Sequence, residues 1–213
     1  GEVLSKSPKA LKLDKKNYVW NLTEEERTGN RFANMNVLGD FCYISVGMVV
    51  NANEKDAQGA FKKEDLISDT YDAIHCRKYI EAKDIDKFQV KRVRYLEWNT
   101  ERCPEKLRRP TFRELYDRPK LIMNCLGTIN VTIDAEEHFL HKHSIYCAIL
   151  WKDLKDVSNK SISSSVKKFS KHSREAMESL SEKVDLYYLL GILNSSMADQ
   201  LLTDQRGGDY HIY

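Results

Sequence analysis

The stretch Tyr-Ile-Glu-Ala-Lys-Asp at residues 79–84 places Glu81 two residues before Lys83, and two aspartates, Asp69 and Asp72, lie upstream. Two carboxylates can hold a magnesium ion while a nearby lysine orients the attacking water, as in metal-dependent nucleases. In a chain this rich in charge, the same pattern arises readily by chance. A nuclease site made of Asp72, Glu81 and Lys83 is therefore one hypothesis, and an exposed strand end is the ordinary alternative.

A second group with metal-binding chemistry follows further along the chain. It contains three histidines and two possible carboxylate ligands: His138, His141, His143, Glu136 and Glu137. Zinc needs a defined third and fourth ligand and an ordered second shell, which ligand spacing alone does not supply. A polar turn before the next strand is the favoured interpretation, so we expect no metal site here.

Basic residues outnumber acidic ones in the middle of the chain. Between Arg77 and Lys120 there are fourteen lysines and arginines against eight aspartates and glutamates, and five aromatic residues are interleaved with them: Phe88, Tyr95, Trp98, Phe112 and Tyr116. On adjacent strands, such an excess could form a stripe that neutralises DNA phosphates. Composition alone favours the ordinary alternative, in which the charges solvate a sheet and the aromatic residues fill its core.

The overall composition is that of a folded domain. The 213 residues, 41% hydrophobic and 31% charged, are enough for one sizeable core with an appendage. Net charge is only +2, so attraction to a polyanion must come from local clustering. The five widely spaced cysteines and the lack of a long apolar run lead us to expect a cytoplasmic protein without a membrane partner. A first residue that is Gly rather than Met leads us to expect a piece of a longer protein.

Most of the elements that must position these residues are strands. Residues 40–53 predict a strand in which Gly47 is a bulge or a point of close approach. Capping-box spacings that begin at Thr23 and Thr111 predict two short helices. Further strand patterns occur at 78–82, 92–98, 120–127, 128–133 and 145–151. The predicted fold class is therefore α+β, a mixed but mostly antiparallel sheet lobe with short helices, followed by a C-terminal helical segment.

The C-terminal part has a different composition. Residues 158–181 are rich in Ser and Lys and predict a linker that leads into an exposed basic helix. From Asp185 onward, apolar residues recur at steps of three and four, which predicts a helix with a core-facing stripe: Leu186, Leu189, Leu190, Leu193, Met197 and Leu201. We expect a mainly β lobe over 1–157, and over 158–213 a linker plus a helical segment that packs on it.

Six segments follow one another in a recognisable order. They are YVWNL at 18–22, FCYISVGMVVNAN at 41–53, YIEAKDIDKFQV at 79–90, RRPTFRELYDRPKLIMNCLG at 108–127, HSIYCAIL at 143–150 and DLYYLLGILNSSMADQLL at 185–202. This order resembles the TaqI-like C-terminal specificity domain. That domain is the target recognition domain of type IIG restriction-modification enzymes and related adenine-specific DNA methyltransferases.

The resemblance implies that the chain reads a short sequence in double-stranded DNA. An upstream methyltransferase domain of the same chain, and in restriction enzymes a nuclease domain, would then act at the right place. Adenine methylation needs an Asn-Pro-Pro-Tyr loop, and this sequence contains no Pro-Pro. S-adenosylmethionine and magnesium are therefore expected in the parent enzyme, and no cofactor, metal site or catalytic residue in this fragment.

Base reading in the major groove uses Arg or Lys for guanine and Asn or Gln for adenine, while other basic groups hold phosphates. Pro119 would fix the entry of the strand that follows it, so that Lys120 reaches a phosphate, while Arg118 either projects or pairs with an acidic neighbour. The candidate DNA-binding residues are Lys91, Arg92, Arg94, Arg108, Arg109, Arg113 and Lys120. A rival hypothesis is a protein-interaction module, in which the helix at 185–202 and the basic helix before it dock a partner.

Overall fold

The computed structural model describes residues 13–14, 19–20, 36–125, 127–169 and 171–200. The chain divides into two compact units, Gly1–Asn36 and Val37–Tyr213. In the first unit, β1 (Leu13–Asp14) pairs antiparallel with β2 (Val19–Trp20). The helix predicted from Thr23 lies outside the described residues. All other elements belong to the second unit.

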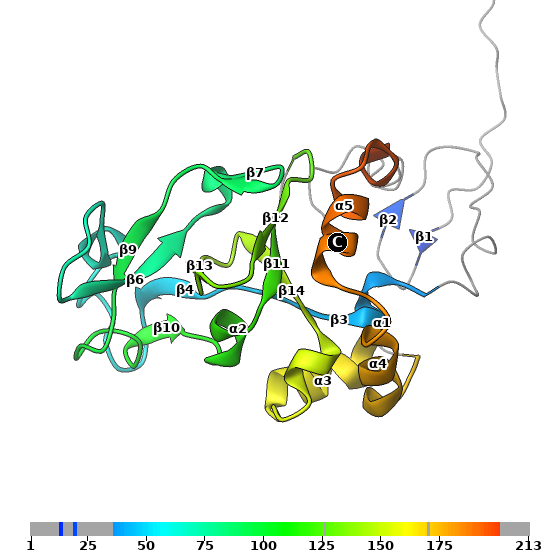
Figure 1. The fold of residues 1–213 in the computed structure, drawn as a ribbon. Helices are drawn as coiled ribbons and strands as arrows, with labels where there is room; N and C mark the ends of the chain where they lie inside the picture. The colour runs from blue at the N-terminus through cyan, green and yellow to red at the C-terminus, as the bar shows by residue number, and fades with distance from the viewer. Residues whose placement is uncertain (1–12, 15–18, 21–35, 126, 170, 201–213) are drawn as a thin grey trace, which may run out of the picture. The chain divides into compact units, whose positions relative to one another are not determined.

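A four-stranded antiparallel sheet forms the centre of the second unit (Figure 1). Its strands, in spatial order, are β12 (Val131–Asp134), β11 (Lys120–Asn124), β14 (Ile145–Leu150) and β3 (Cys42–Val46). Side chains alternate between its faces: Leu121 and Met123 join one apolar cluster, while Ile122 joins the other. Both faces of this sheet are therefore buried.

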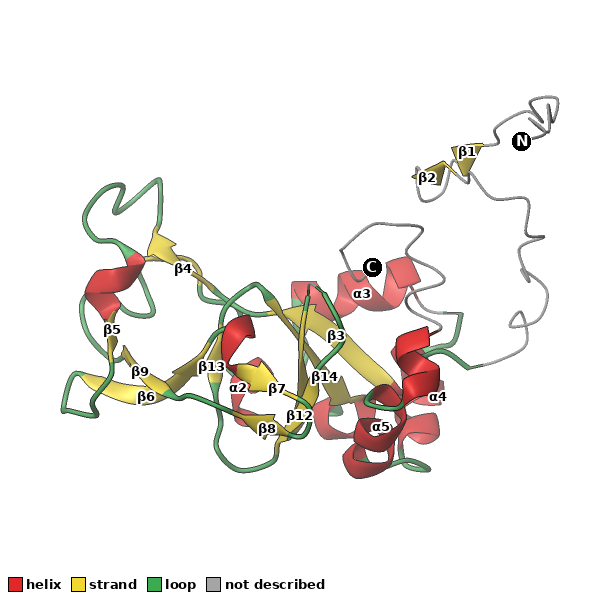
Figure 2. Ribbon diagram, turned by 90° about the horizontal axis from the view of Figure 1, so that it is seen from above, coloured by secondary structure: helices red, strands yellow, loops and turns green. Residues whose placement is uncertain are grey.

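A second four-stranded sheet lies at the end of the unit away from helices α3 to α5 (Figures 1 and 2). Its order is β13 (Leu140–His141), β6 (His75–Ile80), β9 (Arg94–Glu97) and β5 (Ile67–Ser68), and β13 pairs with β6 in parallel. Two antiparallel ribbons complete the β structure: β4 (Val49–Ala52) with β10 (Leu107–Arg109), and β7 (Ile85–Asp86) with β8 (Gln89–Val90).

Gly47 separates β3 from β4 at a point of close backbone approach. A Cβ atom at this position would overlap the carbonyl group and the ring of His141. The adjacent N–H of Met48 donates to the carbonyl oxygen of His141 over 3.0 Å. The prediction of a close approach at Gly47 is confirmed, and it explains why the predicted strand over 40–53 is two strands joined by a glycine.

The Ser/Lys-rich stretch forms two helices, α3 (Lys160–Phe169) and α4 (Arg174–Ser181), so the prediction of a linker there was wrong. Each helix places one fully buried side chain, Ile162 or Met177, in the main apolar cluster. Arg174 also donates to the carbonyl oxygens of Leu154 and Val157. Val166 of α3 also packs against this cluster, and the hydroxyl of Ser181 at the end of α4 accepts from the N–H of Lys152.

Helix α5 (Leu186–Leu193) begins where the sequence predicts, because the side chain of Asp185 accepts a hydrogen bond from the N–H of Tyr188 over 2.7 Å. Its residues Leu186, Leu189 and Leu190 pack on Leu121 and Met123 of the central sheet. The helix breaks at Asn194 and Ser195, and helical residues resume at 196–200. The break changes the helical phase, so Met197, predicted in the buried stripe, is 73% exposed.

The remaining α-helices are short: α1 (Leu38–Phe41) and α2 (Glu114–Asp117). The capping box predicted at Thr111 is absent from α2, because the Thr111 hydroxyl contacts Tyr116 and the carbonyl group of Pro110. Among the described residues, no helix is both long and apolar enough to cross a membrane. The structure confirms the α+β fold class, with mostly antiparallel sheets and helices toward the C-terminus.

Candidate nucleic-acid interface

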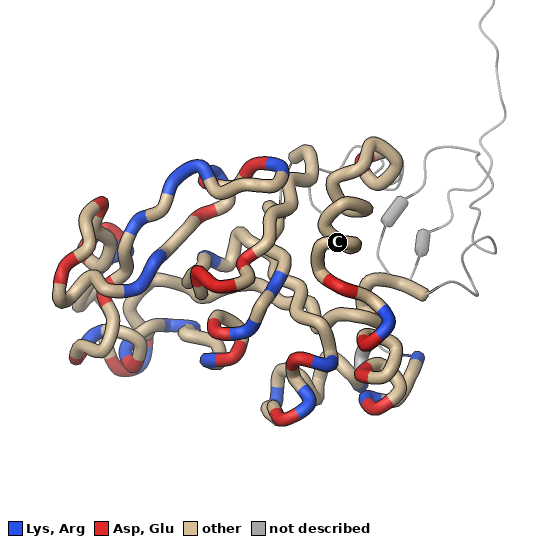
Figure 3. Tube along the Cα trace, in the orientation of Figure 1, with Lys and Arg blue, Asp and Glu red and all other residues tan. Residues whose placement is uncertain are grey.

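Basic and acidic residues are interspersed along the chain, as Figure 3 shows. The seven candidate DNA-binding residues consequently do not form one stripe. Two of them are buried in ion pairs, two lie on the loop between β8 and β9, two lie on β10, and one lies beside α2. These locations differ in how exposed the basic side chains are, and therefore in whether they can contact DNA.

Lys120 is fully buried, so the prediction that it reaches a phosphate was wrong. Its ammonium group lies 2.6 Å from the carboxylate of Asp134, the residue directly opposite it on β12, and donates to the carbonyl oxygen of Tyr116 over 2.6 Å. Asp134 also accepts hydrogen bonds from the N–H groups of His138 and Phe139. The lysine of the Arg-Pro-Lys motif therefore joins two central strands. Arg118 projects outward and pairs with Asp156 over 2.9 Å.

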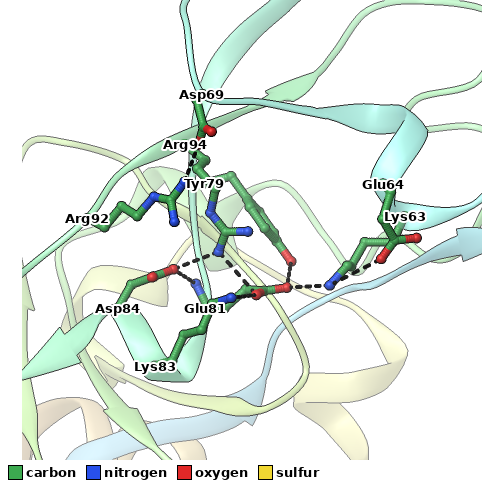
Figure 4. Close-up of polar contacts among 9 residues, drawn as sticks. All are labelled: Lys63, Glu64, Asp69, Tyr79, Glu81, Lys83, Asp84, Arg92 and Arg94. Atoms are coloured by element: carbon green, nitrogen blue, oxygen red, sulfur yellow. Dashed lines mark hydrogen bonds and ion pairs between the residues drawn. The ribbon is translucent and has the colours of Figure 1, made fainter.

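Arg94 is also held inside the protein, in the ionic cluster of Figure 4. Its guanidinium lies 2.7 Å from Asp84 and 3.1 Å from Glu81, and it stacks over the ring of Tyr79. Burial favours a higher pKa for Glu81, but hydrogen bonds and charges from Lys63 and Arg94 outweigh it and lower this pKa to about 2. Arg94 therefore serves the protein interior, and its prediction as a DNA contact was wrong.

Four further candidates are exposed and paired with carboxylates, and Arg108 lies 3.4 Å from Glu54. Arg92 lies 2.5 Å from Asp69, and Lys91 lies 3.8 Å from Asp86. Arg113 lies 2.6 Å from Asp117 beside α2. Exposed pairs of this kind contribute about 0–1 kcal/mol, so these cations can exchange a carboxylate for a phosphate at little cost.

An open hollow of about 470 Å³ is lined by His143, and the charges of Arg108 and Arg109 on β10 act on this histidine. Strand β4, the loop before the 3-10 helix Lys63–Leu66 and the turn after β13 line this hollow. Its charged and polar lining residues are Asn51, Lys62, Lys63, Glu64, Lys142 and His143. Arg109 stands opposite Val49, another lining residue, across the β4–β10 ribbon.

The positive charges around this hollow act together on His143. Partial burial and then the charge of Lys142 lower the pKa of His143, and the two arginines of β10 lower it further. Three cations from two separate chain segments therefore surround one exposed imidazole. We call Asn51, Lys62, Lys142 and His143, together with the neighbouring Arg108 and Arg109, the basic hollow.

The basic hollow contains residues that sequence reasoning missed. Asn51, Lys62, Lys142 and His143 come from segments separated by up to about ninety positions in the chain, and none lies in the basic stretch 77–120. The sequence did carry one signal for Asn51. This residue lies in the predicted strand segment that contains Gly47, at a position where alternation places the side chain on the exposed face. The approach of these segments depends on the pairing of β4 with β10 and the contact between Met48 and Lys142.

The nuclease hypothesis required Asp72 and Glu81 to share one metal ion. These residues flank opposite ends of β6, and an extended strand of six residues separates its ends by roughly 20 Å. Asp72 caps its own turn, accepting from the N–H groups of Ile74 and His75, and hydrogen bonds from His75 and Ile74 lower its pKa to about 2. Glu81 is engaged by cations, Lys83 among them at 3.6 Å. The predicted site is not assembled.

The three histidines also diverge. His141 is fully buried against Tyr116, while His143 borders the basic hollow and His138 borders a second hollow beside α2. Within the part of the chain that the structure describes, no three His, Cys, Asp or Glu side chains gather in a way that could hold a metal ion.

Comparison with known proteins adds no family assignment. No protein-family model matches the chain, and no curated protein matches it significantly.

Proposed function

We propose that this chain recognises a specific sequence in double-stranded DNA, as the target recognition domain of a type IIG restriction-modification enzyme or an adenine-specific DNA methyltransferase. The observation that carries the proposal is the basic hollow. It combines exposed cations that can hold phosphates with a two-stranded ribbon of the kind that fits the major groove.

The family resemblance supports the same function in a different way. Two of the segments that carry the resemblance supply Lys120 and Asn194. Lys120 joins β11 to β12, and Asn194 ties the residue after α5 to β12. Motifs with such roles specify a scaffold. The residues that contact DNA can then differ between members without loss of the fold, because they lie on exposed loops and on the β4–β10 ribbon.

In this proposal the reaction takes place in a neighbouring domain of the same polypeptide. S-adenosylmethionine and magnesium would bind there, and this chain would supply affinity and target choice. Its own side chains would hold the duplex in register through phosphates and read base edges through the groove.

Selection from a library of duplexes with a randomised central segment tests the proposal. The chain is immobilised, bound duplexes are recovered over several rounds at moderate salt, and their sequences are compared with the starting pool. We expect a short preferred sequence. Recovery of duplexes with no sequence preference, or of no duplex at low salt, would contradict the function proposed.

The exposed side of α5 favours a second candidate, contact with another protein domain. Tyr187, Tyr188 and Ile192 are 67%, 61% and 44% exposed. Residues 186–198 include no charged side chain. Such a surface suits an apolar protein face better than DNA. In the proposed enzyme, the upstream methyltransferase domain would be its partner.

A further inference from the structure

The β4–β10 ribbon has an inner and an outer face. Val50 and Leu107 are buried, and Leu107 stands opposite Ala52. Residues directly opposite one another in an antiparallel pair share a face, so these side chains mark the inner face. Alternation then places Val49 and Asn51 on the outer face, where Asn51 is exposed.

A register shift between Leu107 and Arg109 changes which residue of β4 stands opposite Arg109. In a regular strand, residues two apart share a face, so Arg109 would accompany Leu107 inward. The shift adds one residue to β4 between Val49 and Ala52, so Arg109 stands opposite Val49, which is half-buried. Arg109 itself is exposed. The ribbon thus presents an arginine and an asparagine that are both exposed.

Asn51 and Arg109 differ from the other candidates in their interactions. Within the described residues, neither side chain has a hydrogen bond or an ion pair. Arg92, Arg108 and Arg113 each have a carboxylate partner. An asparagine amide can form two hydrogen bonds with adenine, and a guanidinium can form two with guanine, both in the major groove.

We propose that Asn51 and Arg109 are the base-reading pair of this domain, with Asn51 directed to an adenine and Arg109 to a guanine. The β4–β10 ribbon enters the major groove, which is about 12 Å wide and admits a two-stranded ribbon. Lys62 and Lys142, which come from separate segments of the basic hollow, hold the flanking phosphates. This inference rests on the proposed function.

The test compares four variants with the preferred sequence of the wild-type chain. For Asn51→Ala, we expect the preference for adenine at one position to fall by roughly 5- to 150-fold, the discrimination that one bidentate contact supplies. For Arg109→Lys, which keeps the charge but loses the planar fork, we expect the preference for guanine to fall at another position. Both variants should keep the salt slope, because neither changes the charge.

Two control variants distinguish residues that read bases from residues that hold phosphates. Lys62→Ala should weaken binding to all sequences about equally and flatten the salt slope by about 0.9, without changing the preferred bases. Lys160→Ala on α3 removes an exposed lysine that does not line the hollow, and it should change neither quantity. Thermal melting of each variant verifies that it is folded.

Unchanged base preferences in both Asn51→Ala and Arg109→Lys would overturn this inference and leave DNA binding in place. A wild-type chain that selects no sequence would contradict the proposed function itself. Loss of adenine preference in the first variant and of guanine preference in the second would support the assignment.

Discussion

Asn194 takes the place of a neighbouring strand beside Val131 at the edge of the central sheet. Its amide nitrogen donates to the carbonyl oxygen of Val131 over 2.8 Å, and its amide oxygen accepts from the N–H of Val131 over 3.0 Å. The first residue after α5 thereby hydrogen-bonds both backbone groups of one residue in an edge strand. This exchange ties the C-terminal helix to β12.

Replacing Asn194 by Ala should destabilise the protein, because it leaves the buried N–H of Val131 without a partner and leaves the carbonyl oxygen of Val131 with only the N–H of Phe88. An orphaned buried group costs about 1–3 kcal/mol. Unfolding in guanidinium chloride measures the change. Gln58→Ala, which removes an exposed amide from a loop, is the control and should change stability by less than about 0.5 kcal/mol. Equal midpoints for the two variants would show that the exchange does not stabilise the fold.

The buried pair of Lys120 and Asp134 predicts a non-additive pair of substitutions. Lys120→Met leaves the carboxylate buried without its cation and should cost about 3–5 kcal/mol. Adding Asp134→Asn removes the unpaired charge and should restore part of that loss, because the amide oxygen still accepts from one of the two backbone N–H groups that the carboxylate binds. A double-mutant cycle of unfolding free energies measures the coupling. Strictly additive losses would contradict a direct pair.

Gly47 and Gly39 form a matched pair that tests how closely the backbone at Gly47 approaches His141. Gly47→Ala should destabilise the protein by several kcal/mol, because the new methyl group overlaps the backbone of His141. Gly39→Ala places a methyl group in α1 with nothing within 4 Å, and it should stabilise the fold by about 0.5–1 kcal/mol. Thermal melts of both variants provide the comparison. A neutral Gly47→Ala would mean that β4 does not approach His141 so closely.

His141 predicts a loss of stability in mild acid. Burial, and then the charge of Lys120, lower its pKa from 6.5 to about 3. Between these values the unfolded chain binds a proton that the folded chain does not, so stability present above pH 6.5 falls as pH drops toward 3, by up to roughly 1.4 kcal/mol per pH unit.

His141→Phe should flatten the stability profile between pH 7 and pH 5, measured by urea unfolding at each pH. Neither ring nitrogen of His141 has a hydrogen-bond partner, so an apolar ring removes no hydrogen bond from that side chain. Glu81, whose pKa is about 2, titrates below this window in both proteins and does not obscure the comparison. Identical profiles for the two proteins would mean that His141 titrates normally in the folded state.

Much of the fold followed from local patterns. Strand patterns located β11 and β14, and Asp185 marked the start of α5. These features depend on neighbours within a few residues. The local sequence is therefore enough to predict them.

The wrong predictions share a physical cause. Lys120 reads as a surface cation because its partner, Asp134, stands fourteen positions later on another strand. The linker was predicted over the first part of this stretch because Ser and Lys dominate its composition, whereas Ile162 of α3 is buried in the main apolar cluster. In each case the deciding contact is long-range, and local composition carries no trace of it. The basic hollow was missed for the same reason.

The salt dependence of duplex binding tests the central claim most directly. Fluorescence anisotropy gives the affinity of a labelled duplex across a salt series for the wild-type chain, for Arg108→Ala/Arg109→Ala, and for the charge-matched control Lys160→Ala/Lys167→Ala on α3. We expect the β10 double variant to bind more weakly, because Arg109 contacts a base, and its salt slope to flatten by about 0.9, because Arg108 contacts one phosphate. The α3 control should behave as the wild type. Equal affinities and slopes for all three proteins would contradict a DNA interface at β10.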